Sequence, residues 1–265
     1  MDRLLVLRLE STGCPAEAVL NGVPLARVGG AQTVVTLPVH EFTLAGTNEV
    51  ELVVHPGPPA AAASEPEPML SDGQSAASLR LLLPRVGSVA HPANARTLVQ
   101  LDWAPVADEV FEAPLRIGKQ VELPIGFPRW RWLDAPVIAD SPTLKKDVAR
   151  YLLDIAVGLS RGNPEPLIQA TRLRLEDLAQ AYQRNLADDV GRLRLHIQEL
   201  HAAQPLKPVL PAPAKLVLRP VAGGRLLECL AGDGTPFLQS PVAGGGVATW
   251  PLRLAAIDGR FYGLR

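Results

Sequence analysis

The stretch from Ala16 to Val28 reads AEAVLNGVPLARV, in which two runs of strand-forming residues meet at Asn21-Gly22. Asn-Gly accepts the positive φ angles of a tight turn, so it is typical of the two-residue loop of a β-hairpin. We therefore predict that the residues on either side of this dipeptide form two antiparallel strands. The rest of the first half can be built outward from this hairpin.

A third strand is predicted between residues 49 and 54. There, Val50, Leu52 and Val54 alternate with Glu49 and Glu51, which is the period of a strand with one buried face. Further short runs with strand character follow, at residues 78–83, 97–103, 119–123 and 129–132. Short strands separated by turn-forming residues are typical of a sandwich, so we predict an antiparallel β-sandwich over residues 1–135.

One segment of this predicted sandwich has no strand pattern. Residues 55–68 read HPGPPAAAASEPEP, which combines proline, alanine and acidic side chains. Proline cannot donate a backbone hydrogen bond, and small or charged side chains bury little apolar surface. We therefore predict a mobile, Pro/Ala-rich loop over residues 56–76.

The pattern changes to helical spacing after residues 140–143, which read DSPT. Ser141 is predicted to cap a first helix, with Pro142 at the first helical position, where its missing N–H costs nothing. Apolar residues three and four positions apart then predict three helices. One ends at Gly162, one starts at residues 163–164, and one starts at residues 188–189.

Strand character returns from residue 215 onward, and Asp258-Gly259 marks another tight hairpin turn. The sequence therefore predicts an α+β protein, with an N-terminal antiparallel β-sandwich followed by a helical plus antiparallel β domain. This second domain, a helical hairpin plus a β-sheet, is predicted over residues 141–265. The junction between the two domains is expected between Asp134 and Asp140.

Charge and hydropathy exclude several classes of protein. The net charge of −1 gives no overall field that would recruit nucleic acid. No run of about 18 uninterrupted apolar residues occurs, so we expect no membrane insertion. Asp2, Arg8 and Glu10 interrupt or flank the apolar N-terminal run, which is unlike a signal peptide.

The two cysteines indicate whether a disulfide or a zinc site is to be expected. Cys14 and Cys229 are the only two, and they fall in different predicted domains. This arrangement favours neither a disulfide nor a zinc site. Arginine is used far more than lysine, and alanine, leucine and proline are abundant, as in GC-rich bacterial genomes. We expect a bacterial, cytoplasmic protein without a cofactor.

Two motifs in the first half, LNGVPL at residues 20–25 and FTLAGTNEVEL at residues 42–52, resemble the galactose-binding-like jelly-roll domains. Those domains share an NG hairpin and a later G-x-N-x-L strand entry. The resemblance implies a jelly-roll architecture and leaves a sugar ligand open.

In the second half, the helix end at residues 161–163 and the closing stretch WPLRLAAIDGRFY at residues 250–262 resemble the SnoaL-like cone fold of the nuclear-transport-factor family. Members of that family range from isomerases to binding modules. The resemblance therefore implies a fold and leaves the function open.

Two other motifs have the composition of a catalytic or metal site. Residues 158–162 match the G-x-S-x-G pattern of a nucleophile elbow around Ser160, but an elbow needs a strand before the serine. The preceding residues have helical spacing, so we predict a helix end instead. His196, Glu199 and His201 lack the spacing of H-E-x-x-H and are predicted to face solvent. No catalytic residue or metal ligand is predicted.

The candidate binding residues are Arg129, Trp130 and Arg131, next to Trp132. On a strand, the two tryptophans would point one way and the two arginines the other. The rings either pack in the core, which is the favoured interpretation, or form a platform for a sugar or a partner protein. If the chain acts by binding a protein, we expect Trp130, Arg129 and Arg131 to anchor it.

Because no catalytic constellation is evident, we expect a non-catalytic protein that binds another protein, in the manner of an immunity protein or an adaptor. Two alternatives stay open. A carbohydrate-binding module requires exposed Trp130 and Trp132. A small-molecule enzyme using a cone-fold pocket requires a deep pocket with a buried acid or histidine.

Overall fold

The computed structural model describes residues 4–55, 67–85, 87, 90–124 and 126–265. The chain divides into two compact units, residues 1–129 and residues 130–265, which we call the N-terminal unit and the C-terminal unit. The division lies between Arg129 and Trp130, ahead of the predicted junction between Asp134 and Asp140. That each unit folds as an independent domain stays a prediction.

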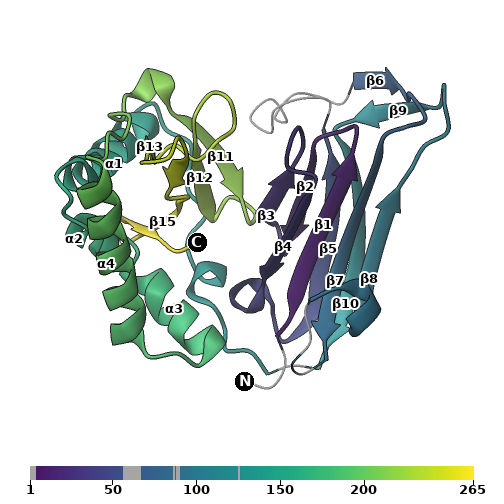
Figure 1. Ribbon diagram of the computed structural model, residues 1–265, viewed down its shortest axis with the longest axis horizontal. Helices are drawn as coiled ribbons and strands as arrows, with labels where there is room; N and C mark the ends of the chain where they lie inside the picture. The colour runs from purple at the N-terminus through teal and green to yellow at the C-terminus, as the bar shows by residue number, and fades with distance from the viewer. Residues whose placement is uncertain (1–3, 56–66, 86, 88–89, 125) are drawn as a thin grey trace. The chain divides into compact units, whose positions relative to one another are not determined.

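The N-terminal unit contains two four-stranded antiparallel sheets that pack face to face (Figure 1). Their strand orders are β4-β1-β7-β8 and β10-β5-β2-β3, and β6 and β9 pair separately as a two-stranded ribbon. The strands are β1 (Val6–Thr12), β2 (Ala16–Leu20), β3 (Val23–Val28), β4 (Val34–Pro38), β5 (Gly46–Val54), β6 (Glu67–Leu70), β7 (Ala76–Pro84), β8 (Ala95–Trp103), β9 (Val110–Ala113) and β10 (Leu115–Leu123).

Alternating side chains build the core between these sheets. In β5, Val50 and Leu52 are fully buried, whereas Glu49 is exposed. Leu7 of β1 and Leu79 of β7 are also fully buried. The alternation predicted over residues 49–54 is confirmed as far as Leu52, but it is wrong at Val53, which is fully buried although it shares a side with Glu49 and Glu51.

The hairpin turn at Asn21-Gly22 is confirmed. The two residues have φ angles of 52° and 75° and join β2 to β3. The Asn21 side chain donates to the Phe42 carbonyl at 2.8 Å and accepts from the Glu49 N–H at 2.9 Å. The motif asparagine therefore ties the turn to the start of β5, which is a structural role.

The prediction of a loop over residues 56–76 is wrong for part of its length. Residues 56–66 lie outside the described residues, but Glu67–Leu70 forms β6 and pairs antiparallel with β9. Pro68 fits this strand because a two-stranded ribbon leaves N–H groups unpaired on its outer edges. The ladder with β9 supplies hydrogen bonds that the composition of the segment does not reveal.

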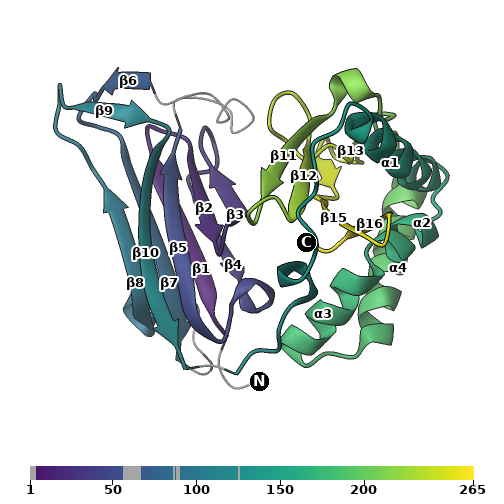
Figure 2. The same ribbon diagram turned by 180° about the vertical axis from the view of Figure 1, so that it is seen from behind.

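The C-terminal unit packs helices against a four-stranded antiparallel sheet of order β11-β12-β15-β16, with a second pair β13-β14 (Figures 1 and 2). Its core includes Leu152 of α1, Ile197 of α4 and Leu254 of β15. The elements are α1 (Leu144–Ser160), α2 (Glu165–Ala170), α3 (Arg172–Tyr182), α4 (Leu186–Ala203), β11 (Val217–Val221), β12 (Leu226–Leu230), β13 (Gln239–Pro241), β14 (Val247–Thr249), β15 (Arg253–Ile257) and β16 (Arg260–Gly263).

The predicted helix boundaries need three corrections. The first helix starts at Leu144 and not at Pro142, and Ser141 does not cap it. The second is interrupted at Thr171, whose hydroxyl and backbone N–H both donate to the Leu167 carbonyl, at 2.7 Å and 2.9 Å. The last helix is capped by Asn185, whose side chain accepts from a backbone N–H.

The hairpin turn predicted at Asp258-Gly259 is confirmed, with φ angles of 50° and 73° between β15 and β16. The α+β class is confirmed as well. The jelly-roll and cone-fold assignments are finer than this description and stay proposals.

Candidate functional site

The predicted binding residues do not form a surface platform. Residues 129–132 are not a strand, because the backbone from Arg131 to Leu133 forms a 3-10 turn. Trp130 and Trp132 are buried, with only 1% and 2% of their surfaces exposed. Both rings therefore pack in the core, which is the favoured interpretation. The Trp130 ring is therefore too buried to contact a partner directly.

Arg131 forms ion pairs with two acidic side chains of α3. Its Nη1 lies 3.1 Å from Asp177 Oδ1, and its Nη2 lies 2.7 Å from Glu176 Oε2. The buried Asp177 carboxylate also contacts Arg265, with 3.0 Å between Oδ2 and Nη1. Arg131 therefore has a role in the fold of the C-terminal unit. Arg129 is exposed in the N-terminal unit, and a binding role for Arg129 and Arg131 stays a prediction.

The catalytic and metal-like motifs also have structural explanations. Ser160 is the last residue of α1 and donates to the Val157 carbonyl at 2.9 Å, and Gly162 follows with a φ of 67°. The predicted helix end is therefore confirmed. His196 and Glu199 are exposed on α4 as predicted, whereas His201 is half-buried and its Nδ1 accepts from the Leu206 N–H at 3.3 Å. In the described part of the chain, no group of three or more His, Cys, Asp or Glu side chains could hold a metal ion.

An exposed apolar surface lies on the two-stranded ribbon of β6 and β9, which Figure 2 shows beside the sandwich strands. Leu70 and Val110 are directly opposite each other on its two strands, and 68% and 65% of their surfaces are exposed. Val106, in the turn before β9, is 73% exposed. Alternation places Phe111 on the opposite face, where its ring lies 5.1 Å from that of Trp103. One face of the ribbon is thus anchored and the other is open.

The surroundings of this open face are acidic. Residues 67–75 and 104–113 contain no Lys, Arg or His. Four acidic side chains in these segments are exposed, namely Asp72, Asp108, Glu109 and Glu112. Backbone N–H groups of Gln74 and Ser75 bond the Asp72 carboxylate and hold its pKa below the usual range. We call Leu70, Val106, Val110 and these four acids the ribbon face. The sequence does not reveal this face, because β6 falls within residues 56–76, for which a loop is predicted.

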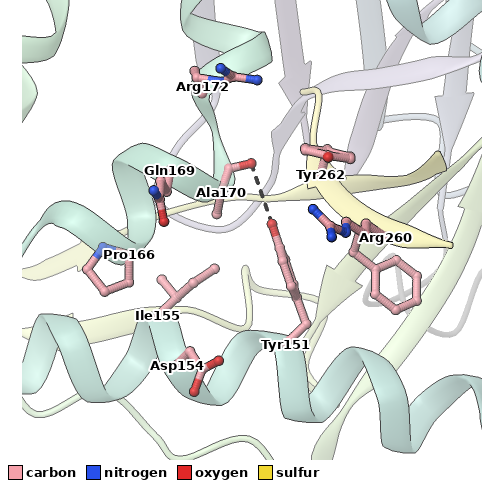
Figure 3. Close-up of a pocket in the computed structure, with 10 residues that line it drawn as sticks. Tyr151, Asp154, Ile155, Pro166, Gln169, Ala170, Arg172, Arg260 and Tyr262 are labelled. Atoms are coloured by element: carbon pink, nitrogen blue, oxygen red, sulfur yellow. Dashed lines mark hydrogen bonds between the residues drawn. The ribbon is translucent and has the colours of Figure 1, made fainter. Parts of the chain in front are cut away.

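A pocket of 590 Å³ lies within the C-terminal unit (Figure 3). Its walls are formed by α1, α2, the start of α3 and β16. Polar and aromatic side chains line most of it, including Tyr151, Asp154, Gln169, Arg172, Arg260 and Phe261. Neither Arg172 nor Arg260 belongs to a sequence motif from which a binding site is predicted. The two arginines come together only through the fold.

Tyr151 extends from α1 toward α2 across this pocket (Figure 3). Its hydroxyl donates to the Ala170 carbonyl at 3.4 Å, a long hydrogen bond. Burial raises the pKa of the Tyr151 phenol, so it stays neutral at physiological pH. The Phe261 ring is tilted against the Tyr151 ring, with 5.8 Å between centroids. The acid in the lining, Asp154, is exposed, and no histidine is among the described lining residues.

Comparison with protein-family models, with curated proteins and with solved structures found no match to this chain. Within the described residues, no helix combines the length and the apolar character needed to cross a membrane.

Proposed function

We propose that this chain is a non-catalytic binding protein that docks another protein on the ribbon face, as an immunity protein or an adaptor does. The observation that carries this proposal is the exposure of Leu70, Val106 and Val110 together. Single exposed apolar residues are ordinary, but a cluster of large ones with a polar rim is typical of an interaction surface. The ribbon face combines exposed apolar residues with exposed acids, and protein interfaces combine an apolar core with a polar rim.

Rigidity adds to this argument. Phe111 lies on the anchored face of the ribbon and its ring packs edge-on against Trp103 of β8. The ladder from Glu67 to Leu70 fixes both strands in register. A preorganised surface loses less conformational entropy on binding than a flexible one, so more of its contact energy appears as affinity.

The charges indicate the kind of partner. Four exposed acids lie in the two ribbon segments, and neither segment contains a basic residue. A complementary protein therefore carries an apolar centre with a basic rim, and opposite charges accelerate its association. Arg129, which lies in the same unit, is retained as a proposed additional contact.

The two alternatives have less support. A carbohydrate platform at Trp130 and Trp132 needs exposed rings, and both rings are buried. A cone-fold enzyme needs a buried acid or histidine in its pocket, whereas Asp154 is exposed. No specific observation favours either alternative.

Site-specific photo-crosslinking tests the proposal. A benzoylphenylalanine at Val110 should crosslink a different protein in cells of the source organism, whereas the same residue at Val247 should not. Val247 is a matched control because it is also an exposed strand valine, at 58%. The purified partner should bind the double variant Leu70→Asp, Val110→Asp at least about tenfold more weakly, and Val247→Asp as tightly as the unmodified chain.

Raising the salt concentration should slow association with that partner, because exposed charges separated by about 10 Å or more are screened at 0.1 M salt. Equal crosslinking at Val110 and Val247, crosslinks only to a second copy of this chain, or unchanged affinity in the double variant would each contradict the proposal.

A further inference from the structure

We propose that the pocket of the C-terminal unit binds a small aromatic carboxylate. This inference is independent of the ribbon face, which belongs to the other unit. It rests on the size of the pocket, the balance of charges along its wall and the aromatic rings beside them. The volume of 590 Å³ is in the range of pockets that enclose small organic ligands.

The pocket carries an excess of positive charge. Arg260 is exposed and makes no ion pair with any residue that the structure describes. Arg172 is near one acid, Glu176, but the distance from its Nε to Oε1 is 3.9 Å, at the outer limit of an ion pair. The other oxygen of Glu176 lies 2.7 Å from Arg131, so its charge is shared. Both pocket arginines therefore retain donors for a ligand.

The magnitude of this charge favours a monoanion. Arg172 and Arg260 contribute two positive charges, and Asp154 contributes one negative charge to the same lining. The net charge of the lining matches a carboxylate better than a doubly charged phosphate. Guanidinium groups present parallel N–H donors that fit the two oxygens of a carboxylate.

The position of Asp154 also orients the ligand. In Figure 3, Asp154 lies beside α1, and Arg172 lies on the opposite side of the set of residues that line the pocket. A carboxylate is therefore directed toward Arg172 and away from Asp154. The Gln169 amide, on α2, offers a further neutral donor on the lining.

Aromatic side chains provide the rest of the site. The Tyr151 and Phe261 rings meet at a tilted angle of 57°, and both line the pocket. Aromatic rings favour offset or edge-on contact with other rings, so a planar ligand ring fits this wall better than a flexible chain. The neutral Tyr151 hydroxyl keeps lone pairs that can accept a hydrogen bond from a ring substituent.

Calorimetric titration with 1-naphthoate as the probe tests this site. We expect saturable binding with a dissociation constant at or below about 1 mM. The uncharged analogue 1-naphthamide should bind at least about tenfold more weakly, since it cannot pair with the arginines. Acetate, which has the charge but no ring, should give no saturable binding in the same range.

Arg260→Gln and Arg172→Gln should each weaken 1-naphthoate binding roughly tenfold, because each removes a charged donor. Arg161→Gln is the matched control, since Arg161 is exposed after α1 and does not line the pocket. It should leave the affinity unchanged. Circular dichroism confirms that each variant is folded.

Three results would overturn the inference. These are no saturable binding of 1-naphthoate, equal affinity for 1-naphthamide, or equal losses in Arg260→Gln and Arg161→Gln. The ribbon variants Leu70→Asp and Val110→Asp should bind 1-naphthoate normally, so a failure here is distinguishable from a failure of the proposed protein partner.

Discussion

Each unit contains a carboxylate that pairs with two arginines, and the two carboxylates differ in burial: Glu10 is 30% exposed, whereas Asp177 is 5% exposed. In the N-terminal unit, Glu10 of β1 pairs with Arg8, two residues away on the same strand, and with Arg80 on the neighbouring strand. In the C-terminal unit, Asp177 pairs with Arg131 and with Arg265, which are 46 and 88 residues away in sequence. Local alternation places Arg8 and Glu10 on one face of β1, but it carries no information about Arg80, which is 70 residues from Glu10, or about either partner of Asp177.

The units also differ in the charge of their candidate sites. The ribbon face has four exposed acids and no base in its segments. The pocket has two arginines, Arg172 and Arg260, and one acid, Asp154. A net charge of −1 conceals both surfaces, because opposite local charges cancel in the sum. Overall charge therefore excludes a general attraction to nucleic acid but says little about particular sites.

The largest expected effects test whether the units are independent. Leu79 in β7 and Leu152 in α1 are both fully buried. Leu79→Ala and Leu152→Ala should each lower the free energy of unfolding of their own unit by about 3 kcal/mol, through lost burial and a new cavity. Hydrogen exchange with mass spectrometry measures the protection of backbone amides in both units in one sample. Equal loss of protection in both units from either substitution would mean that they unfold as one.

A second test concerns the long-range cluster. Asp177→Asn removes the carboxylate that contacts the fully buried Arg265 guanidinium, and should cost about 3 kcal/mol in the unfolding of the C-terminal unit. Glu176→Gln is the control on the adjacent position. Its carboxylate is partly exposed, so its loss should cost less than about 1 kcal/mol. Urea unfolding of both variants measures the difference, and similar costs would show that burial of the cluster is unimportant.

What could be predicted from the sequence followed from local chemistry. Asn21-Gly22 and Asp258-Gly259 form tight turns because their own backbones accept positive φ. Gly162 ends α1 for the same reason. The alternation around Leu52 needs only the geometry of a strand. These elements can be predicted without knowing which distant residues they contact.

What could not be predicted depended on partners far along the chain. Trp130 is buried, as the favoured interpretation predicts, but the Arg265 guanidinium 5.8 Å from its ring centroid could not be predicted, because Arg265 is far away in the sequence. The composition around Pro68 suggested a loop, yet β9 provides a pairing strand. Arg172 of α3 and Arg260 of β16 both line the pocket, and neither residue alone indicates a site.

The smallest expected effects compare one surface ion pair from each unit. The hydrogen bond from Arg8 lowers the pKa of Glu10, and the hydrogen bond from Arg194 lowers the pKa of Glu165. Because each carboxyl has a lower pKa in the folded state, its ion pair stabilises the fold at pH values above the ordinary value of 4.5. That contribution is lost as the pH falls through the lowered value.

Glu10→Gln should therefore cost about 1 kcal/mol at pH 7, because Glu10 is 30% exposed and contacts two arginines. Glu165→Gln should cost only about 0.3 kcal/mol, since Glu165 is 56% exposed and contacts Arg194 alone. Both costs should shrink toward zero in unfolding titrations repeated well below pH 4.5, where the native carboxyls also take up protons. Costs that stay constant with pH would show that hydrogen bonding or packing, and not charge, accounts for the difference between the two pairs.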